Sequence, residues 1–400
     1  MRKKTLHDLK DLKGKIVLVR VDFNVPIENG KVTNNARIVA ALPTIEYLIK
    51  NEAKVILLSH LGRIKTEEDK KTKSLKSVAM EFTKASTHAI NFVAYTRGKK
   101  VEEAINNMEN GSIMMIENTR FEDVKNNILV NYESKNDEKL GKYWASLGDL
   151  FVNDAFGTAH RAHASNVGIA KYIKESAIGF LIEKEIKFLH DAISEPKRPF
   201  IALLGGAKVS DKINVIDALA KKADKVIIGT AMCYTFHLAM GKKIGKSLAE
   251  PEKVDLAKKL MKKYQDKLVI ASDSICTKEY KDVKGKVYEN IPDDLMGLDI
   301  GPKTIKVIKK ELKGAKTVIW NGPFGVTEFK NYQEGSKAIA HELINLKDAI
   351  TIIGGGDSAA MAIKMGIEGK ISHISTGGGA SMEFLEGKEL PGIAAINNIN

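Results

Sequence analysis

Two glycine-rich stretches in the second half of the chain contain the residue types of phosphate-binding loops. They are Gly205-Gly206-Ala207-Lys208 and Gly354-Gly355-Gly356-Asp357-Ser358, and each follows a short apolar run and leads into a helix-like stretch. A strand that ends in glycines and opens a helix lets backbone N–H groups and the helix dipole meet phosphate. Lys208 could meet a phosphoryl group, and Asp357 could hold a magnesium ion. The pattern therefore predicts a nucleotide site in the second half.

The first half of the chain instead places basic and polar residues after its expected strands. Ligands bind at the carboxyl ends of strands in doubly wound sheets. Aspartate and asparagine can accept hydrogen bonds from hydroxyls, and arginine can grip phosphate or carboxylate with two parallel bonds. We therefore expect a pocket for a small, highly anionic, hydroxylated molecule. The residues concerned are Asp22, Phe23 and Asn24; Arg37, which opens the first crossover helix; His60, Leu61, Gly62 and Arg63; Arg120; and His160, Arg161 and His163.

The few arginines carry more information than the many lysines. Of 63 lysine and arginine residues only eight are arginine, and the formal net charge is +13. In such a lysine-rich chain an arginine is expected where its planar fork is needed. The paired lysines lie on helix-like faces and favour a solvated surface. Neither a zinc-finger spacing nor an aromatic–basic RNA motif is present, so we expect no specific nucleic-acid partner.

Short β-branched runs alternate with longer amphipathic segments along the chain. This alternation predicts an α/β fold with two doubly wound, Rossmann-like parallel sheets. The helix-like stretch 182–193 is expected to connect them, which gives domains at 1–180 and 196–390, a hinge helix at 181–195 and a C-terminal segment, 391–400, that returns to the first domain. The eleven expected strands are 15–21, 54–58, 90–94, 112–116, 150–153, 200–204, 225–228, 268–271, 317–320, 350–353 and 371–374.

Length and composition fit a soluble protein of two or more domains. The chain has 400 residues, of which 44% are hydrophobic and 28% charged. No stretch approaches the ~18 uncharged apolar residues of a membrane span. The basic start is not followed by an apolar signal region. Two cysteines are too few for a disulfide framework and suit a reducing cytoplasm.

Several motifs along nearly the whole chain together resemble the phosphoglycerate kinase family. Two departures are visible: Ile64 stands where the family usually has proline, and Thr119 where leucine usually precedes Arg120. Neither replaces a ligand. The motifs are Arg20-Val-Asp-Phe-Asn-Val-Pro26, Ser59-His-Leu-Gly-Arg63, Asp154-Ala-Phe-Gly-Thr-Ala-His-Arg-Ala-His163, Gly205-Gly-Ala-Lys-Val-Ser-Asp-Lys212, Trp320-Asn-Gly-Pro-Phe-Gly325, Gly354-Gly-Gly-Asp357 and Ser375-Thr-Gly-Gly-Gly379.

The resemblance implies a monomer that carries out reversible, Mg²⁺-dependent phosphoryl transfer between 1,3-bisphosphoglycerate with ADP and 3-phosphoglycerate with ATP. It assigns the phosphoglycerate to the first-half residues named above. It places Lys208, Arg37 and the glycines Gly377, Gly378 and Gly379 at the transferring group. The nucleotide residues it implies are Lys212, Gly297, Glu328, Gly355, Gly356, Asp357 and Ser358, with Asp357 as the magnesium ligand.

Two other patterns suggest different functions. The stretch 241–247 is one residue short of a Walker loop and follows no clear strand. The spacing Gly354-x-Gly356-x-x-Ala359 fits a loose dinucleotide fingerprint, the basis of an alternative reading as an NAD-dependent dehydrogenase. That reading requires an acidic residue at the end of the next strand, where the sequence has Ser375-Thr376-Gly377. Nucleic-acid binding through the net positive charge stays open as an added role.

Overall fold

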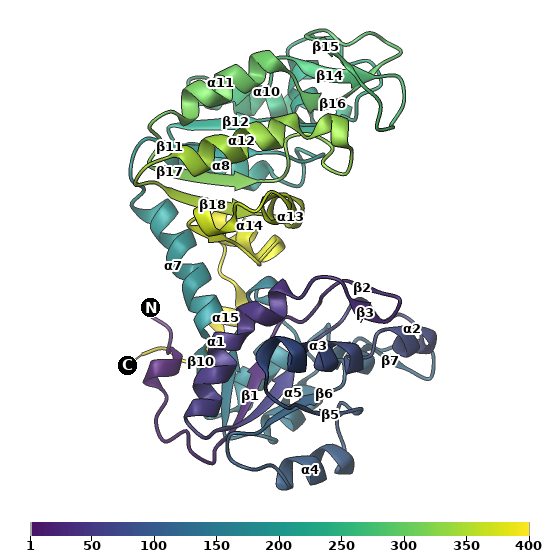
Figure 1. Cartoon of the computed structure of the whole chain (residues 1–400), viewed down its shortest axis with the longest axis vertical. Helices are drawn as coiled ribbons and strands as arrows, with labels where there is room; N and C mark the ends of the chain where they lie inside the picture. The colour runs from purple at the N-terminus through teal and green to yellow at the C-terminus, as the bar shows by residue number, and fades with distance from the viewer. Residues whose placement is uncertain (1, 400) are drawn as a thin grey trace. The chain divides into compact units, whose positions relative to one another are not determined.

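The structure of the chain, a computed structural model, describes residues 2–399. It is an α/β protein built on two six-stranded parallel sheets, as the sequence predicts. Two compact units hold one sheet each (Figure 1). The first unit comprises residues up to 186 together with those from 389 onward, and the second comprises 187–388.

The sheet of the first unit has the order β10-β9-β1-β4-β6-β5, and all its strands are parallel. β9, β1, β4 and β6 are therefore consecutive neighbours, so their carboxyl ends lie side by side. Two short hairpins, β2–β3 and β7–β8, project from loops. The strands are β1 Ile16–Arg20, β2 Ile27–Glu28, β3 Lys31–Val32, β4 Lys54–Leu58, β5 Asn91–Val93, β6 Ile113–Ile116, β7 Val124–Lys125, β8 Ile128–Leu129, β9 Leu150–Asn153 and β10 Glu175–Ile178.

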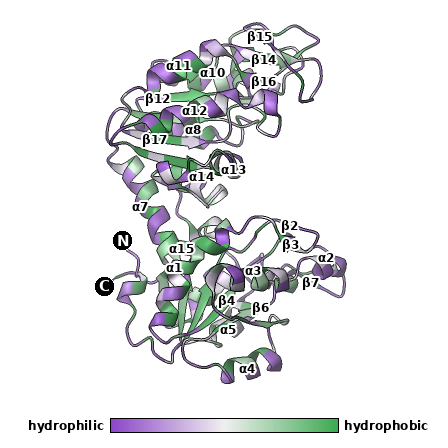
Figure 2. Ribbon diagram, viewed as in Figure 1, coloured by the Kyte–Doolittle hydropathy of each residue, from purple (hydrophilic) through white to green (hydrophobic). Residues whose placement is uncertain are grey.

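Helices flank this sheet because their apolar residues recur at helical spacing. In α1 the buried positions Ile38, Ala41, Ile45 and Leu48 form one stripe, which packs into the same core as the strand residues. Figure 2 accordingly shows the strands as the most hydrophobic elements. The helices are α1 Ala36–Lys50, α2 Glu67–Thr72, α3 Lys76–Ser86, α4 Lys99–Asn106, α5 Glu138–Ala145, α6 Ile169–Tyr172 and α15 Pro391–Ala394, with a π-helical turn at Ala164–Gly168.

The second unit repeats this plan with the strand order β13-β12-β11-β17-β18-β19. A separate antiparallel sheet, β15-β14-β16, is inserted between β13 and β17. The strands are β11 Phe200–Leu204, β12 Lys225–Ile228, β13 Leu268–Ile270, β14 Ser274–Thr277, β15 Lys286–Tyr288, β16 Met296–Ile300, β17 Thr317–Asn321, β18 Ile350–Gly354 and β19 His373–Ile374. The helices are α8 Ile213–Lys222, α9 Met232–Ala239, α10 Val254–Lys263, α11 Pro302–Leu312, α12 Glu334–Asn345, α13 Gly356–Lys364 and α14 Gly379–Leu385.

The chain passes between the units at two places. The first lies within α7, Phe180–Ser194, where the unit boundary falls after Ile186. The second lies at residue 389, after which the chain packs on the first unit. There the Asn153 side chain donates a 2.7 Å hydrogen bond to the Gly392 carbonyl, and the Ser176 amide donates one of 2.6 Å to Asn397 Oδ1.

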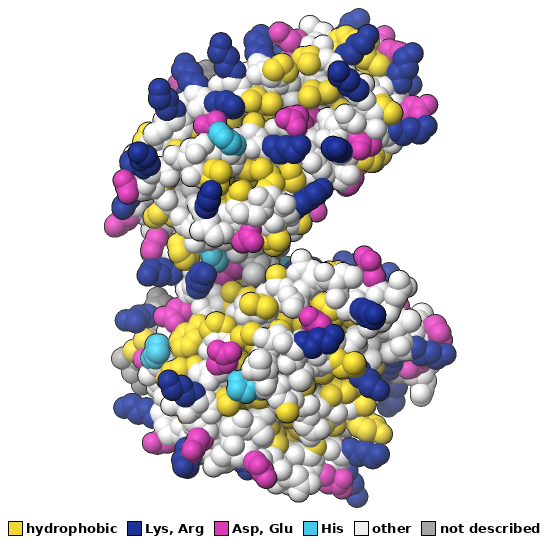
Figure 3. Space-filling model, viewed as in Figure 1, with side chains coloured by type: hydrophobic (Ala, Val, Ile, Leu, Met, Phe, Trp, Pro, Cys, Tyr) yellow, Lys and Arg dark blue, Asp and Glu magenta, His cyan; other side chains and the backbone are white. Residues whose placement is uncertain are grey.

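On the face drawn in Figure 3, lysine and arginine side chains are scattered over both units and mixed with acidic ones. Within residues 2–399, no helix is both long and apolar enough to cross a membrane. The near-Walker stretch 241–247 follows helix α9 and forms turns around an isolated bridge at Ile244, so it lacks the strand that a P-loop requires.

Candidate active site

The basic and polar residues expected in the first half gather at the carboxyl edge of the first sheet. They follow β1, β4, β6 and β9, the four neighbouring strands. A pocket of about 470 Å³ opens there. Its lining includes Arg63, Lys65, Arg120, Arg161 and His163, together with Asp123. Arg63 and Arg161 are exposed, whereas Arg120 is buried to 8% exposure.

Asp22 and Asn24, from the loop after β1, are held by neighbouring groups. Arg37 Nη1 donates to Asp22 Oδ2 at 2.8 Å and to the Asn24 carbonyl at 3.3 Å. The Gly62 amide donates to Asn24 Oδ1 at 2.8 Å. Arg120 Nη1 donates to the Gly62 carbonyl at 2.6 Å. These bonds connect the loops after β1, β4 and β6.

Phe23 and Leu61 have buried side chains in the hydrophobic core. The Phe23 amide donates to Ser59 Oγ at 2.9 Å, and the Leu61 amide to Asn118 Oδ1 at 3.1 Å. These two predicted site residues therefore stabilise the loops that carry the polar groups.

Two histidines at this edge of the sheet, His60 and His163, are buried among arginines. Burial lowers the pKa of His60 well below its usual range, and Arg20 and Arg120 lower it further. Burial lowers the pKa of His163 to about 3, again with help from Arg20 and Arg120. Both rings are thus neutral near pH 7, and the positive charge of the pocket lining is carried by its arginines and Lys65. His160 accepts a 3.2 Å hydrogen bond from Arg161 Nε.

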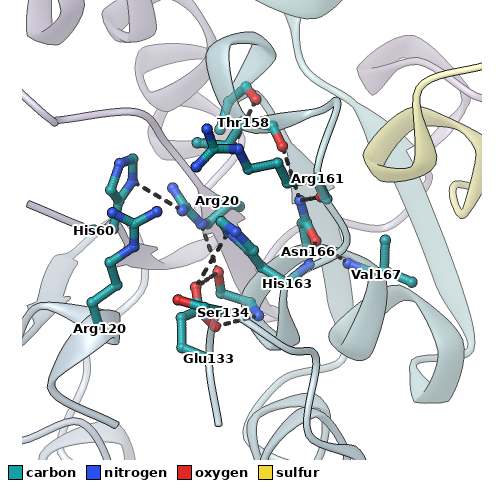
Figure 4. A network of polar contacts seen from close by, with 12 residues as sticks. Arg20, His60, Arg120, Glu133, Ser134, Thr158, Arg161, His163, Asn166 and Val167 are labelled. Carbon is teal, nitrogen blue, oxygen red and sulfur yellow. Dashed lines mark hydrogen bonds and ion pairs between the residues drawn. The ribbon is translucent and has the colours of Figure 1, made fainter. Parts of the chain in front are cut away.

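Several supporting residues were not identified from the sequence. Asn118 donates to the carbonyls of Leu61 and Lys73, both at 2.8 Å, and so connects the loops after β4 and β6. Arg20, quoted only as part of a motif, is fully buried and contacts His60 (Figure 4). Glu133, in the loop after β8, is also fully buried. The sequence did contain a feature that could have identified Arg20, because it is an arginine at the end of an apolar strand. No comparable feature marks Glu133.

The two departures from the family pattern are both buried. Ile64 is 3% exposed and lines the pocket beside Arg63. Thr119 is fully buried, and its Oγ1 has no hydrogen-bond partner among residues 2–399. Neither side chain displaces a basic group from the pocket lining.

In the second unit the glycine loops lie side by side in the same way. The Gly205 loop follows β11, Asn321 ends β17, the Gly354 loop follows β18, and the Gly377 loop follows β19. These four strands are consecutive in the sheet. A side chain at Gly205 would place its Cβ 2.1 Å from the Pro323 carbonyl oxygen, so the close approach of these loops requires glycine.

Lys212 is held between the first two loops. Its Nζ donates to the Gly205 carbonyl at 2.6 Å and to Asn321 Oδ1 at 2.7 Å. Burial lowers the pKa of Lys212 to about 8, although Asp211 and Asp357 act in the opposite direction. Lys208, in contrast, is exposed on the loop itself.

Helices α13 and α14 begin at glycine loops, so their first amides face outward from the sheet edge. Gly355 has φ +90°, a conformation that favours glycine, and it precedes the exposed Gly356 and Asp357. Gly378 precedes the exposed Gly379 at the start of α14. Two buried atoms at this edge, Asn321 Nδ2 and Ser358 Oγ, have no hydrogen-bond partner among the described residues. Buried polar atoms of this kind indicate a site for a polar ligand.

The two remaining residues of the predicted nucleotide site, Gly297 and Glu328, lie outside the glycine loops. Gly297 is in β16 of the small antiparallel sheet, and its amide donates to Ser247 Oγ at 2.9 Å. Glu328 lies in the loop after β17 and accepts a 2.6 Å hydrogen bond from the Tyr280 hydroxyl. The Val326 amide donates to the Leu298 carbonyl at 2.9 Å and thereby joins that loop to β16.

The comparisons with known proteins decide the family. The family model described as "Phosphoglycerate kinase" matches residues 6–388. The chain belongs to the phosphoglycerate kinase family. The predicted activity is confirmed: the protein is a glycolytic phosphotransferase with a carboxyl group as acceptor.

Members of the phosphoglycerate kinase family resemble the chain over its full length. The chain is 59% identical over 401 residues to a phosphoglycerate kinase of Enterococcus faecalis. It is 60% identical over 400 residues to one of Lacticaseibacillus casei, and both comparisons cover 100% of each chain. Among solved structures, that of Coxiella burnetii phosphoglycerate kinase has a TM-score of 0.85 at 37% identity, and that of Pyrococcus horikoshii has 0.84 at 31%, each over 98% of both chains.

Proposed function

We propose that the first unit binds 3-phosphoglycerate, or 1,3-bisphosphoglycerate in the reverse direction, and that the second unit binds ATP or ADP with Mg²⁺. The observation that carries this proposal is the gathering of three arginines and the neutral His163 around one pocket at the carboxyl edge of the first sheet. Such a lining suits an anion that also carries hydroxyl groups.

Within that site, Arg63, Arg120 and Arg161 would bind the phosphate group, because their side chains line the pocket. Asp22 and Asn24 would accept a hydrogen bond from the substrate hydroxyl. His60 and His163 are neutral, so they would act as hydrogen-bond donors or acceptors and not as cations. Arg37, fixed by Asp22, would bind the acceptor carboxylate.

On the second unit, Lys212 and the amides of Gly355 and Gly356 would bind the nucleotide phosphates. Gly297 and Glu328 would lie at the nucleoside, with Glu328 on the ribose hydroxyls. The partnerless Ser358 Oγ and Asn321 Nδ2 support a polar ligand here.

The residues present fit a magnesium ion. Asp357 offers one exposed carboxylate at the first turn of α13, beside the phosphate-binding amides. Magnesium prefers oxygen ligands and usually shares them between one or two carboxylates, phosphates and water. When bound, the ion would supply neutralisation of phosphate charge. Asp357 would hold it at the α13 end of the loop.

The chemistry requires positioning and neutralisation of charge more than proton transfer. The acceptor is a carboxylate, which needs no general base, and phosphoryl transfer depends on in-line alignment. Arg37 would neutralise the acceptor side, and Lys208 with the amides of Gly378 and Gly379 would stabilise the equatorial phosphoryl oxygens.

The two sets of residues belong to different units, so the reaction requires the units to bring their substrates together. We place the hinge in α7, through which the chain passes from one unit to the other, and in the second passage before α15. We further propose a cytoplasmic monomer with no membrane and no specific nucleic-acid partner. Two buried free cysteines are compatible with a reducing compartment.

A coupled assay tests the proposal. ATP consumption should depend on 3-phosphoglycerate and on Mg²⁺, and excess EDTA should abolish it. The variant His60→Gln should raise KM for 3-phosphoglycerate and leave KM for Mg-ATP near the wild-type value. Activity that persists without added Mg²⁺ in EDTA, or equal changes in both KM values, would contradict the assignment.

A further inference from the structure

Arg20, a fully buried arginine, contacts His60, a buried histidine in the loop after β4 (Figure 4). Arg20 is the last residue of β1. Its Nε donates to Ser165 Oγ at 2.7 Å, its Nη1 donates to the Val21 carbonyl, and its Nη2 lies 3.2 Å from His60 Nδ1. All three nitrogen atoms of the guanidinium therefore contact groups inside the protein, and none is directed at solvent.

The contact with His60 defines where the imidazole proton is. A guanidinium has N–H donors and no acceptor. His60 Nδ1 must therefore accept, which means that it carries a lone pair. A neutral imidazole with an unprotonated Nδ1 carries its proton on Nε2. The ring is kept neutral by burial and by the cations that face it, Arg20, Arg120 and Arg37, with His163 also nearby.

Glu133 and Ser165 hold Arg20 in place. Glu133 is fully buried, and it accepts hydrogen bonds from the Ser165 amide at 2.9 Å and from Ser165 Oγ at 2.5 Å. The Ser165 hydroxyl thus donates to Glu133 and accepts from Arg20 Nε. The Glu133 charge also favours the charged form of Arg20. His163 Nδ1 is 4.0 Å from Glu133 Oε1, beyond hydrogen-bond range, so the hydrogen bonds of Glu133 go to Ser165 and, through Ser165, support Arg20.

We propose that Arg20 is a positioning residue: it fixes His60 in the neutral tautomer that presents an Nε2–H donor to phosphoglycerate, and Glu133, through Ser165, holds Arg20 in the required orientation. This inference rests on the proposed assignment of His60 to the acceptor site. The tautomer matters because the substrate is an anion. An Nε2–H group can donate to its oxygens, whereas the other tautomer would direct a lone pair at them.

Nitrogen NMR of the free enzyme, labelled with ¹⁵N only in histidine, tests the tautomer directly. The His60 signals are assigned by their loss in His60→Gln. We expect a protonated, pyrrole-type Nε2 and an unprotonated, pyridine-type Nδ1 from pH 6 to pH 8. A protonated Nδ1 in the wild-type enzyme would overturn the proposal, and this measurement needs no Arg20 variant.

Variants test whether Arg20 selects the His60 tautomer. Arg20→Met alone would leave Glu133 as an unpaired buried charge, so the informative variant is Arg20→Met combined with Glu133→Gln. It should show a mixture of His60 tautomers. KM for 3-phosphoglycerate should rise by the inverse of the remaining Nε2–H fraction, about twofold for an even mixture, with KM for Mg-ATP unchanged. Glu133→Gln alone is the matched control: glutamine removes the charge but keeps an Oε1 acceptor for Ser165 Oγ, so Ser165 still holds the Arg20 donor and the single tautomer should remain.

A double variant that keeps the pure Nε2–H tautomer would show that Arg20 does not select it, and would overturn the proposal. If the double variant does not fold, the wild-type nitrogen shifts still decide the tautomer. The kinetics of His60→Gln test the proposed substrate site separately, so failure of that assignment is distinguishable from failure of the tautomer.

Discussion

Arg37 and Asp22 form an ion pair of 2.8 Å between a partly exposed guanidinium, 36% accessible, and a carboxylate that is only 8% accessible. Arg37 lies in the first turn of α1, whereas Asp22 lies in the loop after β1. A half-exposed ion pair contributes little to folding stability. Its effect is to orient the guanidinium, because one nitrogen is fixed and the remaining N–H groups are left for a ligand.

The first prediction concerns Arg37→Lys. The variant should lose about 10²–10³ in kcat, the usual effect of removing one preorganised transition-state donor. An ammonium keeps the charge but cannot bind Asp22 and the acceptor with the same planar fork. KM for 3-phosphoglycerate should change less, because the pocket arginines bind the substrate phosphate independently.

Arg97→Lys is the matched control for Arg37→Lys. Arg97 is an exposed arginine of the same unit that pairs with Glu122, outside the substrate pocket. Steady-state kinetics with each substrate varied would compare the two. An Arg37→Lys enzyme within a few-fold of the wild-type kcat would remove Arg37 from the catalytic assignment.

The second prediction concerns Asp357→Ala. The exposed carboxylate at the start of α13 should be needed for Mg-nucleotide binding only, because it belongs to the second unit. Calorimetric titration should show weaker binding of Mg-ATP and unchanged binding of 3-phosphoglycerate. Glu368→Ala, an exposed acidic residue of the same unit, serves as control. Equal losses of both affinities would contradict the placement of the metal at Asp357.

The third prediction concerns inorganic anions. Sulfate should compete with 3-phosphoglycerate for the pocket lined by Arg63, Arg120 and Arg161, since it resembles the phosphate group in charge and shape. Chloride at the same ionic strength should inhibit much less. If chloride matched sulfate, general screening would explain the inhibition, and the pocket would have no specific role in it.

The strands were predictable because buried parallel strands are continuous apolar runs. Each of the eleven expected runs forms a strand in one of the two main sheets. β10 was missed since Glu175-Ser176-Ala177-Ile178 is short and half polar, as an edge strand can be. The antiparallel sheet β14–β16 was missed as well. Its pairing brings together segments such as Ser274–Thr277 and Met296–Ile300 that show no uniform apolar run.

Some residues of the candidate site could likewise be predicted from the sequence, and others could not. Residues such as Asp22, Arg63 and Arg161 follow apolar runs, so their common edge could be expected from topology. Glu133 could not, because it lies in a polar stretch that reads as a surface loop. Only the folded chain shows that this loop brings Glu133, fully buried, to Ser165 and Arg20. Buried charges that support a site depend on contacts distant in sequence, which local patterns do not encode.

The last prediction concerns Asp154, which follows β9 and anchors the start of α7. Its Oδ1 accepts hydrogen bonds from the amides of Leu181 at 2.9 Å and Ile182 at 3.2 Å. Its Oδ2 is also buried. Burial raises the pKa of Asp154 to about 7, and hydrogen bonds offset this only in part.

Proton linkage determines in which direction pH changes the contribution of Asp154 to folding stability. Between the unfolded pKa of about 3.9 and the folded pKa of about 7, the folded chain holds a proton on Asp154 that the unfolded chain has lost. The stability from this group is therefore complete below the unfolded pKa and is lost as pH rises through 7.

Asp154→Asn should be more stable than the wild-type protein at pH 8, by on the order of 4 kcal/mol at most. Asparagine keeps the Oδ1 acceptor for Leu181 and Ile182 and carries no charge at any pH. The advantage should shrink as pH falls below 7 and vanish near pH 4. Urea unfolding of both proteins across this pH range measures the difference between their free energies of unfolding. The contributions of other titrating groups are the same in both proteins and cancel. Asp149 is an exposed carboxylate that accepts a hydrogen bond from the Ile16 amide. Asp149→Asn is therefore the control, and its stability relative to the wild type should not rise with pH in this way. An Asp154→Asn protein that is less stable than the wild type at pH 8, by an amount that shrinks toward pH 4, would mean that the ionised carboxylate stabilises the start of α7, contrary to this account.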